Sequence, residues 1–322
     1  MILSVSDLRI AFPQAEGEHA AVDGIGFEVA EGEIFVIIGE SGSGKSLTGM
    51  SIVGLTPAAA RSSGSIRFKQ REMLHRPEAE LRRLRGREIG IVYQDPLSAL
   101  NPVWPVGDQI AEALGVHGLA DRRSASRRAV ELLERVHIAD PARIARAYPH
   151  EISGGMRQRA MIAMALACGP SLLIADEPTT ALDVTIKAQI LELLAELRRD
   201  LALTILLITH DMGVVAELAD RILVMYAGKL AEIGAADDIM RRPAHPYTQA
   251  LMLSAMVSEA PAKSDLRAIV GTAPLPGTHP PGCRFHPRCP AAEPDCRRIE
   301  PRPRPLGPVH LACHHPLAMA ER

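Results

Sequence analysis

Apolar residues follow two spacings along the chain, which predict strands that alternate with helices. Residues 34–38 and residues 172–175 are uninterrupted apolar runs, as is typical of strands buried on both faces of a mainly parallel sheet. Apolar positions in residues 184–200 instead recur every three or four residues and predict an amphipathic helix. We therefore expect an α/β fold with a mixed or parallel core sheet and helices packed on it.

The segments between these runs refine the expected architecture. Residues 1–35 contain alternating apolar positions and glycines, which predict short strands joined by turns. From about residue 105 to residue 148 the pattern is helical and charged, so a helical insert is expected within about residues 95–160. Further strands are expected at residues 89–93, 203–208 and 222–226, and a further helix at residues 47–55.

Composition and charge exclude several classes of function. The formal net charge of -2 over 322 residues argues against a dominant electrostatic role on nucleic acid or anionic lipid. Aromatic residues make up 3% of the chain, which weakens any base-stacking role. The first residues lack a basic segment followed by an apolar stretch, so no secretory signal is expected. Without an export signal, a cytosolic location is expected. Because no run of about 18 apolar residues occurs, we expect that the chain does not cross a membrane by itself.

The composition changes beyond about residue 257. Residues 261–308 contain 12 of the chain's 25 prolines, a density that neither a regular helix nor a central strand tolerates. Four of the five cysteines also lie beyond residue 257, and in a cytosolic chain they are better interpreted as metal or cluster ligands than as disulfides. The fifth, Cys168, is expected to pack as a small apolar residue. We expect a main domain at residues 1–257 and a small, loop-rich extension at residues 258–322.

A glycine-rich loop, Gly-Glu-Ser-Gly-Ser-Gly-Lys-Ser, joins the strand at residues 34–38 to the helix at residues 47–55. Such glycines let backbone N–H groups point toward a polyphosphate, and the helix N-terminus adds a favourable dipole. Lys45 is expected to reach the outer phosphates, and Ser46 to offer its hydroxyl to Mg²⁺. A chance glycine turn is the alternative, and the flanking strand and helix argue against it. The residues expected to bind the nucleotide here are Gly39, Glu40, Ser41, Gly42, Ser43, Gly44, Lys45 and Ser46.

Ser153, Gly154 and Gly155 open a predicted helix and make a second anion-binding N-terminus. The string Ser-Gly-Gly-Met-Arg-Gln-Arg resembles the signature sequence of ABC ATPases, LSGGQ, with Ile152 in place of Leu and Met156 in place of Gln. Alone it is a weak motif, but its place after the glycine-rich loop and before an acidic strand end makes it specific. The resemblance implies an ABC-type P-loop ATPase with N-terminal antiparallel strands. It also implies head-to-tail pairing, in which this serine and the two glycines contact ATP held by the partner.

Two carboxylates, Asp176 and Glu177, end the strand at residues 172–175. Two adjacent carboxylates at the end of a buried strand are costly without cations nearby. The alternative is that they cap the N-terminus of a following helix. By resemblance, Asp176 anchors Mg²⁺ and Glu177 is the catalytic glutamate that polarises the attacking water. Gln94 matches the residue that contacts the metal and the water, and His210 matches the one that contacts the γ-phosphate. The expected catalytic residues are therefore Lys45, Gln94, Glu177 and His210, and the expected Mg²⁺ ligands are Ser46, Gln94 and Asp176.

Two further positions match the family by their place in the chain. Phe12 is a candidate to stack on adenine, with an ordinary core aromatic as the alternative. The string Thr180-Ala181-Leu182-Asp183 matches the D-loop, which crosses the dimer interface in the family. The resemblance covers residues 1 to about 257 and lacks no element of an ABC ATPase.

Three strings resemble the dipeptide, oligopeptide and nickel importers of bacteria. They begin at Gln94, Tyr148 and His245 and read Gln-Asp-Pro-Leu-Ser-Ala-Leu-Asn-Pro, Tyr-Pro-His-Glu and His-Pro-Tyr-Thr-Gln-Ala-Leu. The resemblance implies a heterodimer with a second ABC ATPase, two integral-membrane permeases and an extracytoplasmic solute-binding protein. It places the chain at the cytoplasmic face of the inner membrane, where ATP hydrolysis drives import of peptides, with nickel or another small solute as the less favoured cargo.

The cysteine-rich part resembles the C-terminal extension of these importers, some of which carry a [4Fe–4S] cluster on four cysteines. Spacings of five, six and sixteen residues differ from the compact pairs of zinc ribbons, and they permit an iron–sulfur cluster without demanding one. Zinc and unligated thiols are the alternatives, and three nearby histidines are expected to be surface residues. The expected cluster ligands are Cys283, Cys289, Cys296 and Cys313, and the histidines are His286, His314 and His315.

Two functions of other classes compete with transport. A soluble ABC ATPase that acts on nucleic acid or on the ribosome usually carries a coiled-coil insertion, zinc modules within the cassette or two cassettes, and the sequence shows none of these. A binding protein with an inactive nucleotide site is disfavoured because Lys45, Asp176, Glu177 and His210 are all present. The sequence does not identify the cargo, because the binding protein and the permeases select it.

Overall fold

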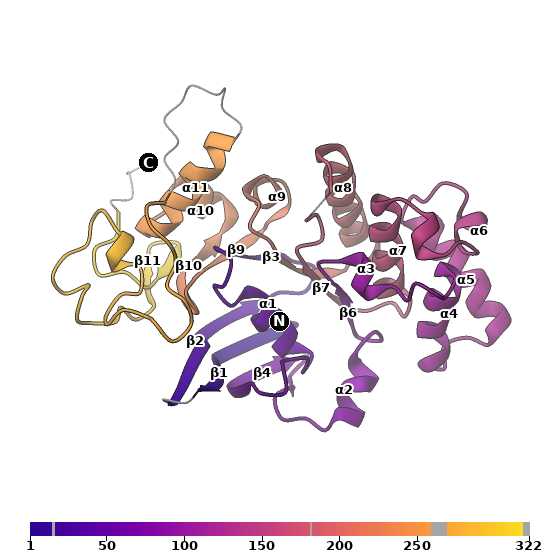
Figure 1. The fold of residues 1–322 in the computed structure, drawn as a ribbon, viewed down its shortest axis with the longest axis horizontal. Helices are drawn as coiled ribbons and strands as arrows, with labels where there is room; N and C mark the ends of the chain where they lie inside the picture. The colour runs from indigo at the N-terminus through magenta and orange to yellow at the C-terminus, as the bar shows by residue number, and fades with distance from the viewer. Residues whose placement is uncertain (15–16, 181, 259–268, 318–322) are drawn as a thin grey trace. The chain divides into compact units, whose positions relative to one another are not determined.

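The computed structural model describes residues 1–14, 17–180, 182–258 and 269–317, with backbone only for residues 255–258. The chain divides into two compact units. Figure 1 shows its helices and strands. Unit 1 is formed by residues 1–75 together with residues 208–322, and unit 2 by residues 76–207. The composition suggests a different division, with a domain boundary at residue 257. That boundary stays a prediction.

An antiparallel sheet opens unit 1, in the strand order β2-β1-β4-β5. Its first two strands are 12 and 13 residues long, so the prediction of short strands joined by turns is wrong here. A bulge near Asp7, whose φ is 49°, keeps each strand continuous where the apolar alternation breaks, and Gly24 (φ 71°) lies against it. The strands are β1 (Leu3–Gln14), β2 (Gly17–Val29), β4 (Arg61–Phe68) and β5 (Arg71–Glu72).

The other strands of unit 1 follow the order β11-β12-β10-β9-β3. β3 pairs with β9 in parallel, while β9 and β10 are antiparallel, so the expected mixed sheet is confirmed. Every residue of β3 is buried, as its uninterrupted apolar run predicts. The strands are β3 (Ile34–Ile38), β9 (Arg221–Tyr226), β10 (Lys229–Ala235), β11 (Arg304–Leu306) and β12 (Val309–Leu311), and the helices are α1 (Lys45–Ile52), α9 (Met212–Leu218), α10 (Ala236–Arg241) and α11 (Pro246–Ser258).

The proline-rich extension contributes only short elements to unit 1 among its described residues. β12 adds to the free edge of β10, and β11 pairs with β12 at the outside. Pro305 lies in this outermost strand, where its missing N–H breaks no hydrogen bond of a central strand. One turn of 3-10 helix, η2 (His286–Arg288), stands between two of the cysteines.

Unit 2 contains three strands in the order β8-β7-β6. It also contains the helices that were expected between residues 95 and 160. β7 pairs with β6 in parallel and is fully buried. In α8 the residues Ile190, Leu193 and Leu197 are buried on one face, which confirms the predicted amphipathic helix. The strands are β6 (Ile89–Val92), β7 (Leu172–Asp176) and β8 (Thr204–Ile208), and the helices are α2 (Glu78–Leu84), α3 (Pro96–Ala99), α4 (Val106–Val116), α5 (Arg122–Arg135), α6 (Pro141–Ile144), η1 (Pro149–Glu151), α7 (Gly154–Leu166) and α8 (Val184–Leu201). Among the described residues, no helix has the length and apolar character needed to cross a bilayer.

A buried polar network fixes the start of α11 in unit 1. The carboxylate of Glu232 in β10 accepts the N–H groups of Ala244, at 2.9 Å, and His245, at 3.0 Å. The Nδ1 atom of His245 in turn accepts the N–H of Tyr247 at 3.0 Å. Burial lowers the pKa of His245 to about 4, because the imidazolium would lose its hydration. His245 is therefore a neutral acceptor in the folded chain at neutral pH.

Lowering the pH from 6.5 to 4 is expected to reduce the free energy of unfolding through His245. Its pKa is 6.5 in an unfolded chain and about 4 in the folded chain, so the unfolded chain binds the additional proton in this window. The contribution of His245 to the free energy of unfolding is therefore complete above pH 6.5, and below that pH it falls by up to about 1.4 kcal/mol per pH unit. Urea unfolding at several pH values measures this slope, and His245→Gln should flatten it by that amount.

The exposed residue His310 in β12 provides the matched control. His310→Gln should keep the slope of the unmodified chain. Burial raises the pKa of Glu232, so this residue contributes with the opposite sign, but it is present in all three proteins and cancels in the comparison. Equal slopes for His245→Gln and the unmodified chain would show that His245 is not the group responsible.

Candidate functional site

The glycine-rich loop leaves β3 and enters α1 in unit 1. Gly39 (φ 152°), Gly42 (φ 78°) and Gly44 (φ 97°) take backbone conformations that L side chains rarely adopt. A Cβ atom on Gly39 would lie 2.2 Å from the carbonyl oxygen of Met225 in β9. The surface of the loop is therefore formed by backbone at these positions, which is what close approach of a polyphosphate requires.

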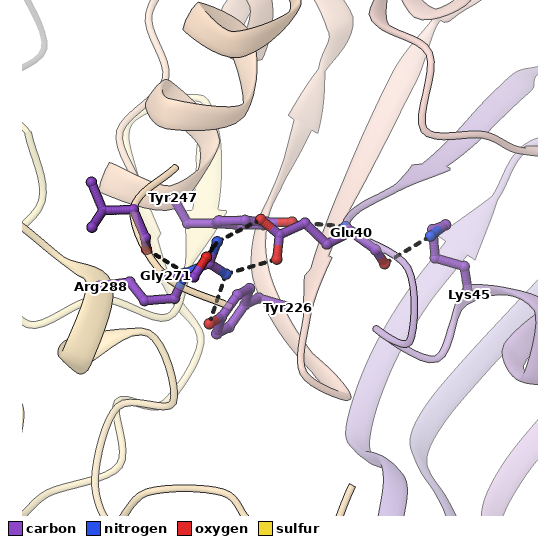
Figure 2. A network of polar contacts seen from close by, with 7 residues as sticks. Glu40, Lys45, Tyr226, Tyr247, Gly271 and Arg288 are labelled. Carbon is purple, nitrogen blue, oxygen red and sulfur yellow. Dashed lines mark hydrogen bonds and ion pairs between the residues drawn. The ribbon is translucent and has the colours of Figure 1, made fainter. Parts of the chain in front are cut away.

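Lys45 is the first residue of α1 and only 5% exposed. Its Nζ atom donates to the carbonyl oxygen of Gly39 at 2.8 Å. It also donates to the carbonyl oxygen of Glu40 at 3.0 Å (Figure 2). These contacts hold the ammonium against the loop that precedes it, next to Ser46. A cation at this place neutralises phosphate charge on the loop.

His210 follows β8 and belongs to unit 1. The N–H of Thr209 donates to the carbonyl oxygen of Ile37 in β3 at 3.1 Å, so this segment runs beside the strand that leads into the loop. The carboxylate of Asp211 caps the N-terminus of α9 and fixes the residue after the histidine. Unit 1 thus brings His210 and residues 39–46 to the same end of β3.

Unit 2 holds the acidic strand end. Asp176 is the last residue of β7 and is 5% exposed, and Glu177 takes a φ of 47°. A non-glycine residue in this conformation is strained, and such residues cluster at functional sites. The Oε2 atom of Glu177 accepts hydrogen bonds from Gln94 Nε2, at 3.0 Å, and from Thr180 Oγ1, at 2.8 Å.

The first of these contacts joins Gln94 to Glu177, which lie 83 positions apart in the sequence. Both residues were predicted from the sequence to be part of the site. Sequence reasoning did not find Thr180 as the second support of the carboxylate, because it placed this residue in the D-loop. The signal available was its spacing, three residues after Glu177, which lets a hydroxyl reach back in a turn. Ala181 of the D-loop lies outside the described residues, while Asp183 caps α8 by accepting the N–H of Ile186 at 2.9 Å.

The signature segment lies at an exposed helix N-terminus in unit 2. The hydroxyl of Ser153 caps α7 by accepting the N–H of Met156 at 3.3 Å. Gly154 is exposed and Gly155 half-buried, and a Cβ atom on Gly155 would approach Ile186 of α8 to 2.9 Å. The free N–H groups of such a terminus bind anions, as the sequence predicts for this segment.

Phe12 is half-buried in β1, and its ring stacks on His19 of β2 with 5.8 Å between the centroids. Sequence reasoning did not single out His19. The sequence spacing of Phe12 and His19 did not indicate this contact, because the two rings meet only through the pairing of β1 with β2. The role of Phe12 in stacking on adenine stays a prediction.

The four cysteines of the extension form one cluster in unit 1. The N–H of Cys283 donates to the carbonyl oxygen of Cys296 at 2.8 Å. The pKa of Cys313 is raised to about 11, first by burial and then by the nearby thiols of Cys283, Cys289 and Cys296, because like charges repel. The remaining cysteine, Cys168, is half-buried in the turn after α7 and donates to the carbonyl oxygen of Ala113 at 3.4 Å.

The spacing of these thiols differs from that of a preformed zinc site. Four sulfur atoms bound tetrahedrally at about 2.3 Å from zinc lie about 3.8 Å from one another. Among the described residues, the only group of at least three metal-binding side chains with ligand atoms within 4.8 Å of one another is Asp295, Cys296 and His315. The Nε2 atom of His315 donates to the carboxylate of Asp295 at 2.9 Å, and His286 and His314 contact the backbone oxygens of Cys283 and Ile299.

Comparison with known proteins identifies the family. Residues 22–180 match the family model described as ABC transporter, and residues 231–296 match the oligopeptide/dipeptide transporter C-terminal region. The chain is 47% identical to the dipeptide transport ATP-binding protein DppD of Haemophilus influenzae, over 98% of this chain and 96% of that protein. It is 48% identical to DppD of Bacillus subtilis strain 168, over 93% and 90% of the two chains.

Solved structures agree with this assignment. A dimeric ATP-binding cassette in a post-hydrolysis state, bound to ADP and Pi, matches with a TM-score of 0.66 and 27% identity over 73% of this chain and 99% of that chain. CbiO1 from Clostridium perfringens, part of the ABC transporter complex CbiONQ, matches with a TM-score of 0.62 and 29% identity, over 74% and 90%. The chain therefore belongs to the ABC transporter family, in the group of dipeptide and oligopeptide transport ATP-binding proteins.

Proposed function

We propose that this chain hydrolyses ATP to drive the import of peptides through an ABC transporter. The observation that carries the proposal is the match over nearly the whole length to dipeptide transport ATP-binding proteins, which includes the C-terminal region of that group. The geometry within each unit supports it, because a glycine loop with its lysine lies in unit 1 and a supported carboxylate in unit 2. Nickel and other small solutes are the less favoured cargo.

ATP and Mg²⁺ fit the residues present. The loop offers backbone and an ammonium to phosphates, and Ser46, Gln94 and Asp176 offer the oxygen ligands that Mg²⁺ prefers. Bound Mg²⁺ supplies charge neutralisation on the phosphates. We assign Lys45 to hold the phosphate charge and His210 to contact the γ-phosphate.

Glu177 is assigned to accept the proton of the attacking water. Gln94 and Thr180 hold its Oε2 atom at 3.0 Å and 2.8 Å, which fixes the carboxylate for this role. Phosphoryl transfer to water needs little covalent help from the protein, so this positioning and the charge on the loop account for most of the expected rate gain.

A second ATPase chain is part of the proposal. The Ser153–Gly155 segment is an anion-binding helix terminus, and the related cassette bound to ADP and Pi is a dimer. We propose a heterodimer, because Met156 stands where the partner ATPases of this group more often keep Gln. The other partners are two integral-membrane permeases and an extracytoplasmic solute-binding protein, and the chain is placed peripherally at the cytoplasmic face of the membrane.

Reconstitution of the transporter tests the function directly. This chain, the partner ATPase and the two permeases are placed in proteoliposomes with ATP inside and the binding protein with a labelled dipeptide outside. We expect uptake that requires ATP and stops with Glu177→Gln. ATPase activity that is stimulated by DNA, RNA or ribosomes and not by the loaded binding protein would support the competing soluble function instead.

We further propose that the cysteine cluster holds a [4Fe–4S] cluster. Four thiolates select iron–sulfur, zinc or Cu(I), and no three of these described sulfur atoms lie within 4.8 Å of one another, whereas a tetrahedral zinc site needs about 3.8 Å. Anaerobic purification should give about four iron and four acid-labile sulfide atoms per chain. Cys289→Ser should lose the iron, whereas Cys168→Ser, outside the extension, should keep it. Stoichiometric zinc without iron in anaerobically purified protein would contradict the cluster.

A further inference from the structure

An ion pair between Arg288 and Glu40 links the described part of the cysteine-rich extension to the glycine loop. Arg288 belongs to η2, and Glu40 is the second residue of the loop (Figure 2). The guanidinium meets the carboxylate with two parallel hydrogen bonds, Nη1 to Oε2 at 2.7 Å and Nη2 to Oε1 at 3.0 Å. The Arg288 side chain is 7% exposed, so this bidentate pair is largely shielded from water.

The remaining donors of Arg288 are also satisfied. Nη1 donates to the hydroxyl of Tyr226 at 3.2 Å, Nε to the carbonyl oxygen of Val270 at 3.0 Å, and Nη2 to that of Gly271 at 3.2 Å. Together with the two bonds to Glu40, these contacts use all five N–H donors of the guanidinium. A lysine has neither the planar fork nor enough donors to replace them.

Glu40 is held from two further sides. Its N–H donates to the hydroxyl of Tyr247 in α11 at 2.9 Å, and Tyr247 is fully buried. Its carbonyl oxygen accepts the ammonium of Lys45 at 3.0 Å. Arg288, Glu40 and Lys45 therefore form a continuous chain of contacts from the extension to the lysine of the nucleotide site (Figure 2).

The extension does not depend on Arg288 for its attachment. Arg284 makes an ion pair with Asp23 of β2 and donates to the carbonyl oxygen of Ala227, at the turn between β9 and β10. β12 also pairs with β10. These anchors would keep the extension docked without the Glu40 pair, so the pair is available for another role.

Charge indicates what that role is. Glu40 places a carboxylate in a loop whose ligand carries several negative charges, and an unpaired carboxylate there would repel the phosphates. Arg288 neutralises this carboxylate and binds both of its oxygens. Burial among neutral groups would not neutralise the Glu40 carboxylate, because the group would either keep its charge or have to take up a proton.

We propose that Arg288 is a positioning residue for the ATP site, through which the extension sets the affinity of the glycine loop for nucleotide phosphates. It acts through Glu40, by cancelling the carboxylate charge and fixing the backbone that contacts Lys45. The inference rests on the proposed function insofar as the loop binds ATP. It assigns to the extension a role that is separate from any group its cysteines hold.

A set of charge variants tests the inference on the full-length chain. The dissociation constant of a non-hydrolysable ATP analogue with Mg²⁺ is measured by isothermal titration calorimetry. Arg288→Gln should weaken binding about tenfold, which corresponds to one unpaired charge near the ligand. Glu40→Gln in the Arg288→Gln background should restore binding to within about threefold of the unmodified chain, because the repelling charge is gone. The loss of affinity in Arg288→Gln should be smaller at high salt, because salt screens the repulsion.

Arg284→Gln is the matched control, since it removes the other arginine anchor of the extension, which pairs with Asp23 of β2. It should leave the affinity unchanged. Equal weakening by Arg284→Gln, or no rescue by Glu40→Gln, would show that the pair only holds the extension in place and would overturn the inference. If Arg288→Gln does not fold, Glu40→Gln alone is tested instead. More than tenfold weaker binding of the ATP analogue by that variant would likewise overturn the inference. An unmodified chain that bound no nucleotide would remove the proposed function, and the inference with it.

Discussion

Glu177→Gln is expected to lower the ATP turnover number by at least about 100-fold while the affinity for ATP stays within about twofold. The amide keeps the size of the side chain and can still accept a hydrogen bond from Gln94 or Thr180, which now hold the carboxylate at 3.0 Å and 2.8 Å. It cannot accept a proton from the attacking water. The loss therefore falls on the chemical step and not on binding.

Turnover is measured as phosphate release by the assembled transporter, and affinity by titration of the purified chain with ATP and Mg²⁺. Glu192→Gln, an exposed carboxylate of α8 in the same unit, is the matched control and should keep full turnover. Gln94→Ala removes one support of Glu177 and should give a smaller loss of turnover than Glu177→Gln. Full turnover in Glu177→Gln would mean that another group activates the water.

The elements that could be predicted from sequence are those whose signal is local. The buried runs became β3 and β7 because a strand covered on both faces must be apolar throughout. The glycine loop and the acidic strand end follow those strands directly, so their places were fixed once the strands were found. A helix at residues 184–200 was predicted for the same reason, since its apolar face recurs with the helical period, and it became α8.

The contacts that could not be predicted join residues far apart in the sequence. Glu40 and Arg288 are 248 positions apart, and Arg288 lies in a proline-rich segment without any periodic pattern. Tyr247 was noticed only as part of a string typical of the family, and nothing local shows that its hydroxyl meets the N–H of Glu40. The bulge at Asp7 was missed because it interrupts the alternation from which the length of β1 was predicted.

Gly39→Ala is expected to destabilise unit 1 and to abolish nucleotide binding with it. The new Cβ atom would lie 2.2 Å from the carbonyl oxygen of Met225 and 2.8 Å from Ser43 Oγ, and the φ of 152° adds backbone strain. The carbonyl belongs to β9, which pairs with β3 and cannot move without breaking the sheet. Relief must come from the loop, at a cost of about 3–5 kcal/mol in the free energy of unfolding.

Gly42→Ala in the same loop separates the close contact from the backbone strain. Gly42 also has a positive φ, 78°, but no described atom beyond its two chain neighbours lies within 4 Å of its Cβ position, so the expected cost is about 1–2 kcal/mol. With about 2–4 °C of melting temperature per kcal/mol for a domain of this size, Gly39→Ala should melt about 10 °C lower and Gly42→Ala only a few degrees lower. Thermal unfolding followed by circular dichroism measures both shifts. Equal shifts would mean that the positive φ, and not the approach to β9, requires glycine at position 39.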